Sequence, residues 1–139
     1  MIFEATITTT TVDDKGNDKA LKRNFVLENY DTFGEVEKKL YEEFGNENGF
    51  EVCAIKISKL KEVANEKPSG DTESKIFIMT ICDTFVLDDG DEKTMKYTVA
   101  FFAKDMREAH QFAQQYIIQG LDDMELKGIK ESKFEEVIR

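Results

Sequence analysis

The sequence predicts an α+β fold built from two tandem ββαβ repeats, in which antiparallel sheet packs against two helices. Residues 2–65 align with residues 76–139 at a constant offset of 74. Strand and helix patterns follow one another in the same order in both copies, and a polar segment holding the only proline separates them. One unit of this size leaves an apolar sheet face uncovered. We therefore expect the two repeats to be related by a pseudo-two-fold axis and to share a core or a continuous sheet.

The alignment of the two copies is nearly free of gaps and contains 18 identical pairs. The pairs include apolar, charged and small residues, so a shared composition does not explain them. One run of identity is Ser58-Lys59 with Ser132-Lys133. The predicted organisation is a first repeat at 1–65, a linker at 66–75 and a second repeat at 76–139, in one compact domain overall.

Three segments in each repeat carry the strand pattern. They are rich in Thr, Ile, Val and Phe, and apolar and polar residues alternate along them. Polar segments with a glycine, at 13–17 and 88–91, follow the first segments as hairpin turns do. The predicted strands cover 2–12, 20–28 and 51–61 in the first repeat, and 76–86, 94–103 and 125–135 in the second.

One helix is predicted in each repeat, between the second and third strands. Apolar residues recur there at helical spacing, and Asp31 or Thr32 in one copy and Asp105 in the other stand where an N-cap acceptor is needed. The two apolar stripes are Phe33, Val36, Leu40 and Phe44, and Met106, Ala109, Ala113 and Ile117.

Successive strand residues point to opposite faces of a sheet, so their parity assigns each one to a face. One face is apolar and is the predicted core. Its residues are Phe3, Ala5, Ile7, Leu21, Phe25, Leu27, Ile55 and Ile57, with Phe77, Met79, Ile81, Met95, Val99, Phe101 and Ile129 in the second copy. The other face holds threonine, serine, asparagine and lysine, and Glu4 is the carboxylate expected on it.

The polar face is the candidate functional surface, because lysines recur on it at equivalent positions in both repeats. Lysines among hydroxyls suit a phosphate backbone, although a solvated sheet face of this composition is also common in proteins without a ligand. Phe134 is the expected outward aromatic, with Leu60 at its partner position. The candidate nucleic-acid-binding residues are Lys22, Arg23, Lys56, Ser58, Lys96, Tyr97, Lys130 and Ser132.

The overall charge favours a different interpretation of function. The net charge is −10 and the pI about 4.7, which argues against binding to nucleic acid or anionic lipid by bulk attraction. The alternative is an acidic protein–protein interaction module, and exposed strand edges would also let two copies pair as a homodimer. We expect no membrane association and a cytoplasmic location, since the chain has no long apolar run and does not open with a signal-peptide pattern.

The sequence predicts neither an enzyme nor a metal or cofactor site. His110 is the only histidine and has no nucleophile pattern beside it. The acidic hairpin turns lack the spacing of a calcium loop. Cys53 and Cys82 are most simply buried free thiols.

Five segments carry a resemblance to known proteins: 3–7, 31–37, 55–59, 77–81 and 104–109. Through these segments the layout resembles a family of small uncharacterised proteins of Bacteroidetes and their crAss-like phages. The resemblance implies a fold similar to the Whirly and PUR class, and a non-enzymatic protein that binds single-stranded nucleic acid. It also implies a phage or mobile-element replication accessory that acts in the cytoplasm of a bacterial host.

Overall fold

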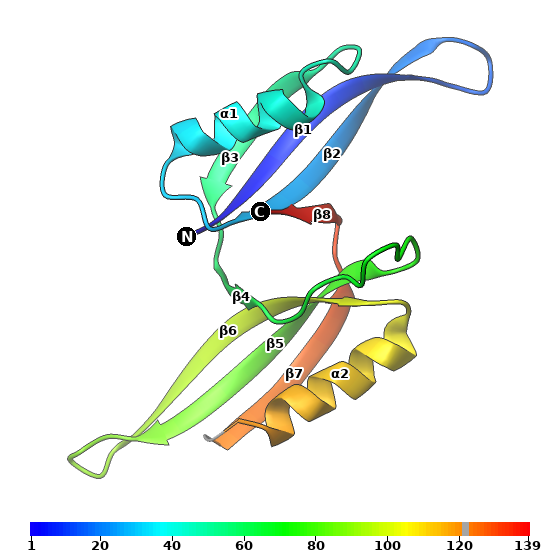
Figure 1. Cartoon of the computed structure of the whole chain (residues 1–139). Coiled ribbons are helices and arrows are strands. Elements are labelled where there is room, and N and C mark those ends of the chain that lie inside the picture. The colour runs from blue at the N-terminus through cyan, green and yellow to red at the C-terminus, as the bar shows by residue number, and fades with distance from the viewer. Residues whose placement is uncertain (121–122) are drawn as a thin grey trace. The chain divides into compact units, whose positions relative to one another are not determined.

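The computed structural model describes residues 1–120 and 123–139 and confirms the α+β class (Figure 1). Each half contains a long hairpin, one helix and two further strands. In chain order the elements are β1 (Ile2–Val12), β2 (Asp18–Glu28), α1 (Phe33–Phe44), β3 (Glu51–Ile57), β4 (Leu60–Val63), β5 (Lys75–Val86), β6 (Glu92–Ala103), α2 (Met106–Ile118), β7 (Asp123–Glu131) and β8 (Phe134–Ile138).

The chain forms two compact units, and neither unit coincides with one repeat. The first comprises Met1–Ser58 and Lys133–Arg139, and the second comprises Lys59–Ser132. The first unit's sheet has the order β3-β1-β2-β8, and the second unit's has the order β4-β6-β5-β7. Each sheet therefore takes one edge strand, β8 or β4, from the other repeat, and that strand pairs in parallel with β2 or β6.

The predicted third strands at 51–61 and 125–135 are wrong in their extent, since each is two strands in different units. β3 ends at Ile57, and the Ser58 amide then donates to the Ile2 carbonyl at 2.8 Å, beyond which the chain leaves that sheet. The Ser132 amide donates to the Ile76 carbonyl at 2.9 Å at the equivalent point. Apolar residues continue past both breaks, so alternation alone does not distinguish one strand from two.

The predicted core face is confirmed where the helix covers it. Phe3, Ile7 and Phe25 are buried in the first unit, as are their counterparts in the second. Ile57, the last residue of β3, is 53% exposed, so its predicted place in the core is wrong. Leu21 and Met95 are also 43% and 50% exposed. Each hairpin extends past the end of its unit's helix (Figure 1), so residues near the hairpin tips keep the predicted parity but are not covered.

The helices begin where the sequence places their caps. Thr32 rather than Asp31 is the first N-cap, and its hydroxyl accepts from the Glu35 amide at 3.1 Å. Asp105 accepts from the Glu108 amide at 2.8 Å. These bonds satisfy amides that the first helical turn leaves unpaired. Within the described residues, no helix is long and apolar enough to cross a membrane.

The segment after β4 is fixed by side-chain hydrogen bonds at both ends. The Asn65 side chain donates to the Phe102 carbonyl at 3.0 Å and accepts from the Phe102 amide at 2.7 Å, so it prolongs the pairing of β4 with β6. Asp71 accepts from the amides of Glu73 and Ser74 at 2.8 and 3.0 Å. The predicted linker at 66–75 is thus a hydrogen-bonded turn whose last residue, Lys75, begins β5.

Replacement of Asn65 with alanine should lower the free energy of unfolding by about 1–3 kcal/mol, because it leaves both buried polar groups of Phe102 without their partner. Urea denaturation of the intact chain measures the change. Asn46→Ala, at an exposed position, is the matched control and should change the stability by less than about 0.5 kcal/mol. Equal stability of the two variants would show that the two Asn65 hydrogen bonds contribute nothing to the free energy of unfolding.

Deletion of residues 133–139 tests the exchange of strands. β8 pairs with Asn24–Leu27, so its removal should increase hydrogen exchange at the β2 amides of the first unit, although the deleted residues belong to the second repeat. The β5 and β6 amides should keep their protection. Loss of amide protection in the second unit alone would contradict the assignment of β8 to the sheet of the first unit.

Candidate nucleic-acid interface

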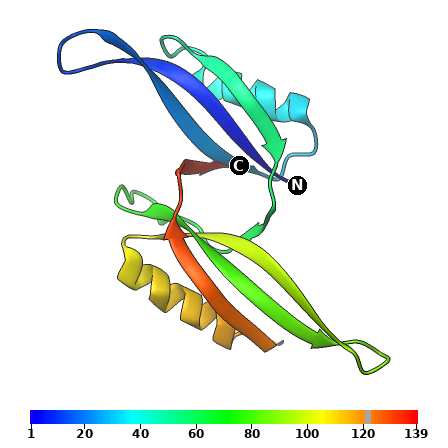
Figure 2. The same cartoon turned by 180° about the vertical axis from the view of Figure 1, so that it is seen from behind.

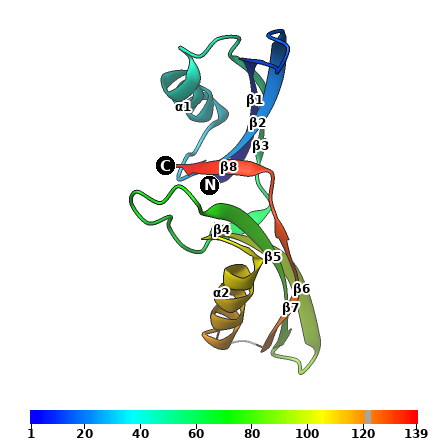
Figure 3. The ribbon, with the colours of Figure 1, turned by 90° about the vertical axis from the view of Figure 1, so that its right-hand side faces the viewer.

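Each sheet has one face covered by its helix and one face without a helix. In Figure 2 the strands of each sheet lie in front of that sheet's helix, and Figure 3 shows α1 and α2 each on one side of their own sheet. We call the uncovered side of each sheet its open face. The lysines and threonines predicted to point away from the core lie there.

Strand register fixes the neighbours on the open face of the first unit. Lys22 lies opposite Thr8, and Lys56 lies opposite Glu4. The Thr6 hydroxyl donates to Asn24 Oδ1 at 2.8 Å across the strand pair. Hydroxyl, amide and ammonium groups are therefore presented side by side, as the sequence predicts.

The second unit repeats this arrangement with changes. Thr80 lies opposite Thr98, and Lys96 lies opposite Cys82. Lys130 lies opposite Ile78, which occupies the position that Glu4 has in the first unit. The open face of the second unit therefore lacks the carboxylate found beside Lys56.

The open-face lysines are available for a ligand. Among the residues that the structure describes, Lys22, Lys96 and Lys130 have no carboxylate oxygen within 4.0 Å, and all three are exposed. Lys56 Nζ lies 3.8 Å from Glu4 Oε1, with its side chain 69% exposed. This separation exceeds a hydrogen-bonding distance, so the pair is loose.

Bulges in β3 and β7 bring two carboxylates to the open faces that parity does not predict. Each bulge inserts one extra residue into its strand, Cys53 in β3 and Lys127 in β7, and the pairing register with the neighbouring strand shifts there. Beyond each bulge the parity is reversed, and Val52 packs on the core while Glu51 lies opposite Thr8. Glu125 likewise lies opposite Cys82, and its Oε2 is 3.1 Å from Lys127 Nζ. Bulges of this kind redirect side chains without interrupting the sheet.

Arg23 is not on the open face. Its guanidinium lies over the rings of Phe25 and Phe44, at 5.4 and 5.2 Å from their centroids. Arg23 Nη1 also lies 2.8 Å from Glu47 Oε2, and Arg23 Nε lies 3.1 Å from Oε2 of Glu135 in β8. The hydrogen bond to Glu135 raises the pKa of the Arg23 guanidinium above its ordinary value. Arg23 therefore fastens β8 and the segment after α1 to β2.

Tyr97 also lies on the helix-covered face, away from Lys96. Its ring packs against the core of the second unit, and its hydroxyl donates to Met124 Sδ at 3.2 Å. Lys61 of β4 places its ammonium 4.1 Å from the ring centroid. Tyr97 is thus a core residue that contacts the exchanged strand, and it is not placed to stack on a base at the open face.

The two predicted serines lie where the chain leaves each sheet. Ser58 Oγ donates to Glu4 Oε2 at 2.7 Å, and Ser132 Oγ donates to the Ile76 carbonyl at 2.8 Å. Phe134 and Leu60, the expected outward pair, are only 8% and 9% exposed. No broad stacking surface is formed by them.

A hollow of about 140 Å³ indents the open face of the first unit. Sequence reasoning missed Lys133, and it placed the aromatic ring of Phe134 in the second repeat rather than in this unit, because both residues reach the hollow only through the exchange of β8. The repeated Ser-Lys pair at 58–59 and 132–133 was the one signal available. The hollow is lined by Glu4, Ala5, Thr6, Asn24, Ala54, Lys56, Lys133 and Phe134.

The cysteines are free, as expected, but they are not buried. Cys53 is exposed, and Cys82 is half-buried. Cys53 Sγ lies 3.9 Å from the Thr8 hydroxyl, at the bulge in β3.

Replacement of Arg23 with glutamine should lower the free energy of unfolding by about 1 kcal/mol, because it removes two ion pairs and the packing of the guanidinium over two rings. Lys22→Gln, one residue away on the open face, is the matched control and should leave stability nearly unchanged. Thermal melting of both variants makes the comparison. A control variant as unstable as Arg23→Gln would contradict the assignment of Arg23 to the covered face.

Comparison with known proteins gives a family and no relative of known activity. No curated protein and no solved structure matches the chain. A family model described as "Domain of unknown function (DUF4494)" matches residues 1–139. The match covers the whole sequence, and the chain therefore belongs to the DUF4494 family.

Proposed function

We propose that this protein is a non-enzymatic binder of single-stranded nucleic acid and that the strand lies on the open faces of the two sheets. One observation carries the proposal: exposed lysines occupy equivalent positions on both faces, and of these only Lys56 has, among the described residues, a carboxylate oxygen within 4.0 Å, that of Glu4 at 3.8 Å. Lys22 corresponds to Lys96, and Lys56 corresponds to Lys130. Threonines next to these lysines offer hydroxyls to phosphate and sugar oxygens, contacts that position a strand without reading its sequence.

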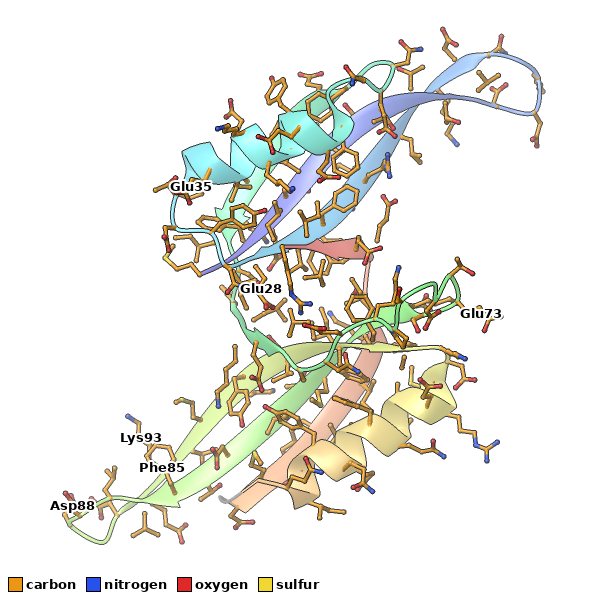
Figure 4. The ribbon with its side chains drawn as sticks, viewed as in Figure 1. Glu28, Glu35, Glu73, Phe85, Asp88 and Lys93 are labelled. Carbon is orange, nitrogen blue, oxygen red and sulfur yellow. The ribbon has the colours of Figure 1, made fainter. Side chains whose placement is uncertain are left out.

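The proposal requires that local charge outweigh the net charge of −10. Many of the acidic groups lie away from the open faces. Figure 4 shows Asp88 at the tip of the β5–β6 hairpin, Glu35 at the start of α1 and Glu73 on the loop before β5. Charges further apart than the Debye length, about 10 Å at 0.1 M salt, are largely screened from one another. A strand on the open face therefore interacts mainly with the lysines beside it.

The proposed role is that of a replication accessory of a phage or mobile element, acting in the cytoplasm of a bacterial host in the Bacteroidetes. The resemblance to single-strand binders of the Whirly and PUR class supports this role. A protein that protects or presents single strands needs contacts to the backbone and tolerance of sequence, which lysines and threonines on an open sheet provide.

The quadruple variant Lys22→Glu, Lys56→Glu, Lys96→Glu and Lys130→Glu should abolish binding of a labelled oligonucleotide in fluorescence anisotropy at low salt. For the wild type, log K should fall steeply with log salt, and each lysine neutralised should reduce the slope by about 0.7. The control quadruple Lys15→Glu, Lys38→Glu, Lys75→Glu and Lys104→Glu makes the same change of charge away from the open faces. It should keep most of the affinity.

Two results would contradict the proposal. Absence of wild-type binding at tens of micromolar protein is one. The other is an equal loss of binding in both quadruple variants, since that would show attraction by total charge alone. Circular dichroism of both variants ensures that unfolding is not the cause.

A second candidate function, protein–protein interaction, is favoured by the edges of the sheets. β3 and β7 each pair on one side only, so their outer backbone groups can accept an added strand from a partner or from a second copy. A partner recovered by pull-down that survives nuclease treatment and is lost on proline substitution in β3 would support this function.

A further inference from the structure

We infer that the hollow on the open face of the first unit is a subsite for one amino-bearing base of the bound strand. The inference rests on the proposed function and adds to it a point of base selectivity. It is carried by the size of the hollow, by the polar atoms around it, and by the difference between the two units at the same position.

The size of the hollow limits what it holds. Its volume is about 140 Å³, whereas pockets for drug-sized ligands and cofactors measure about 300–1,000 Å³. A whole nucleotide cofactor is therefore too large, and a single heterocycle is of suitable size. Ala54 and Phe134 supply apolar contact, and the polar side chains can meet the edge of a base.

Glu4 supplies a hydrogen-bond acceptor with spare capacity. Its side chain is only 16% exposed. Oε2 accepts from Ser58 Oγ at 2.7 Å, and Oε1 has Lys56 Nζ at 3.8 Å. An ordinary N–H···O bond measures about 2.7–3.2 Å. Oε1 can therefore accept from an amino group that enters the hollow.

Asn24 and the two lysines supply donors. The Thr6 hydroxyl donates to Asn24 Oδ1, which leaves the Asn24 amide Nδ2 as the group that can donate to a ligand. Lys56 and Lys133 line the same hollow. The Lys133 ammonium lies 5.9 Å from the centroid of the Phe134 ring. The site thus combines one carboxylate acceptor with several donors.

This combination matches the pairing edge of cytosine. That edge presents an amino donor next to a ring nitrogen and a carbonyl oxygen that accept, and carboxylates are suitable acceptors for the cytosine amino group. Uracil and thymine present a carbonyl oxygen in place of the amino group, and that oxygen would face the Glu4 carboxylate. The hollow should therefore favour cytosine over uracil, two bases of nearly equal size.

The second unit does not offer the same site. Ile78 replaces Glu4, Thr98 replaces Asn24 and Leu60 replaces Phe134 at the equivalent registers. Base selectivity should therefore come from the first unit, with the second unit contributing backbone contacts only. The substitution Glu4→Ile makes the first unit resemble the second at the decisive position.

The test compares oligodeoxycytidine and oligodeoxyuridine of equal length, labelled at the same end, in fluorescence anisotropy with the full chain. The wild type should bind the cytosine strand at least about fivefold more tightly, the lower end of what a well-formed base contact contributes. Glu4→Ile and the isosteric Glu4→Gln should bind both strands within twofold of each other. Thermal melting checks that both variants are folded.

The outcomes separate this inference from the proposed function. Equal wild-type affinity for the two strands, or a preference that survives both Glu4 variants, would overturn the base subsite and leave strand binding intact. No binding of either strand by the wild type would overturn both. Competition by free cytidine monophosphate as strong as that by the strand would also overturn the inference, because the ligand would then be a free nucleotide.

Discussion

Parallel pairing of β8 with β2, and of β4 with β6, is the contact on which each unit depends. Phe25–Leu27 and Val99–Phe101 are buried in the middle of their sheets. Backbone amides and carbonyls in such positions must be hydrogen-bonded, and β1 or β5 satisfies only one side of each strand. The exchanged strands satisfy the other side. They are short, with four residues in β4 and five in β8, so side chains must hold them in place.

Those side chains differ between the units. Arg23 holds β8 through Glu135. In the second unit, Asn65 extends the pairing of β4, and the Tyr116 hydroxyl donates to Glu62 of that strand. Burial and the Glu62 carboxylate both raise the pKa of Tyr116, so its hydroxyl stays protonated as a donor. The charged and aromatic residues on the helix-covered side thus serve the fold, whereas the open faces hold lysine and threonine together with Glu4, Glu51 and Glu125.

The same exchange creates the candidate base subsite. Lys133 and Phe134 follow the point at which the second repeat leaves its own sheet, and they line a hollow whose other residues come from the first repeat. A feature that stabilises the sheet edge therefore also adds a cation and an aromatic ring to a polar face. The difference between Glu4 and Ile78 then makes the two otherwise similar faces chemically unequal.

Sequence by itself determined the elements and most of their faces. The helix caps and the alternation in the hairpins follow from interactions between residues near one another in the chain, so the local sequence pattern reports them. The 74-residue offset shows the same pattern twice. Which strand pairs with which cannot be determined in this way. Strands pair through backbone hydrogen bonds, which do not depend on side-chain identity, and apolar alternation continues unbroken through both points at which the chain changes sheet.

Only the tertiary structure therefore decided three features. It placed β4 and β8 in the sheets of the other repeat. It reversed the parity of β3 and β7 at single bulges, which brought Glu51 and Glu125 to the open faces. It also supplied the partners of Arg23 and Tyr97, which strand parity already places on the covered sides: carboxylates and aromatic rings for Arg23 and the exchanged strand β4 for Tyr97. In each case the deciding contact joins residues far apart in the chain, and no local pattern encodes it.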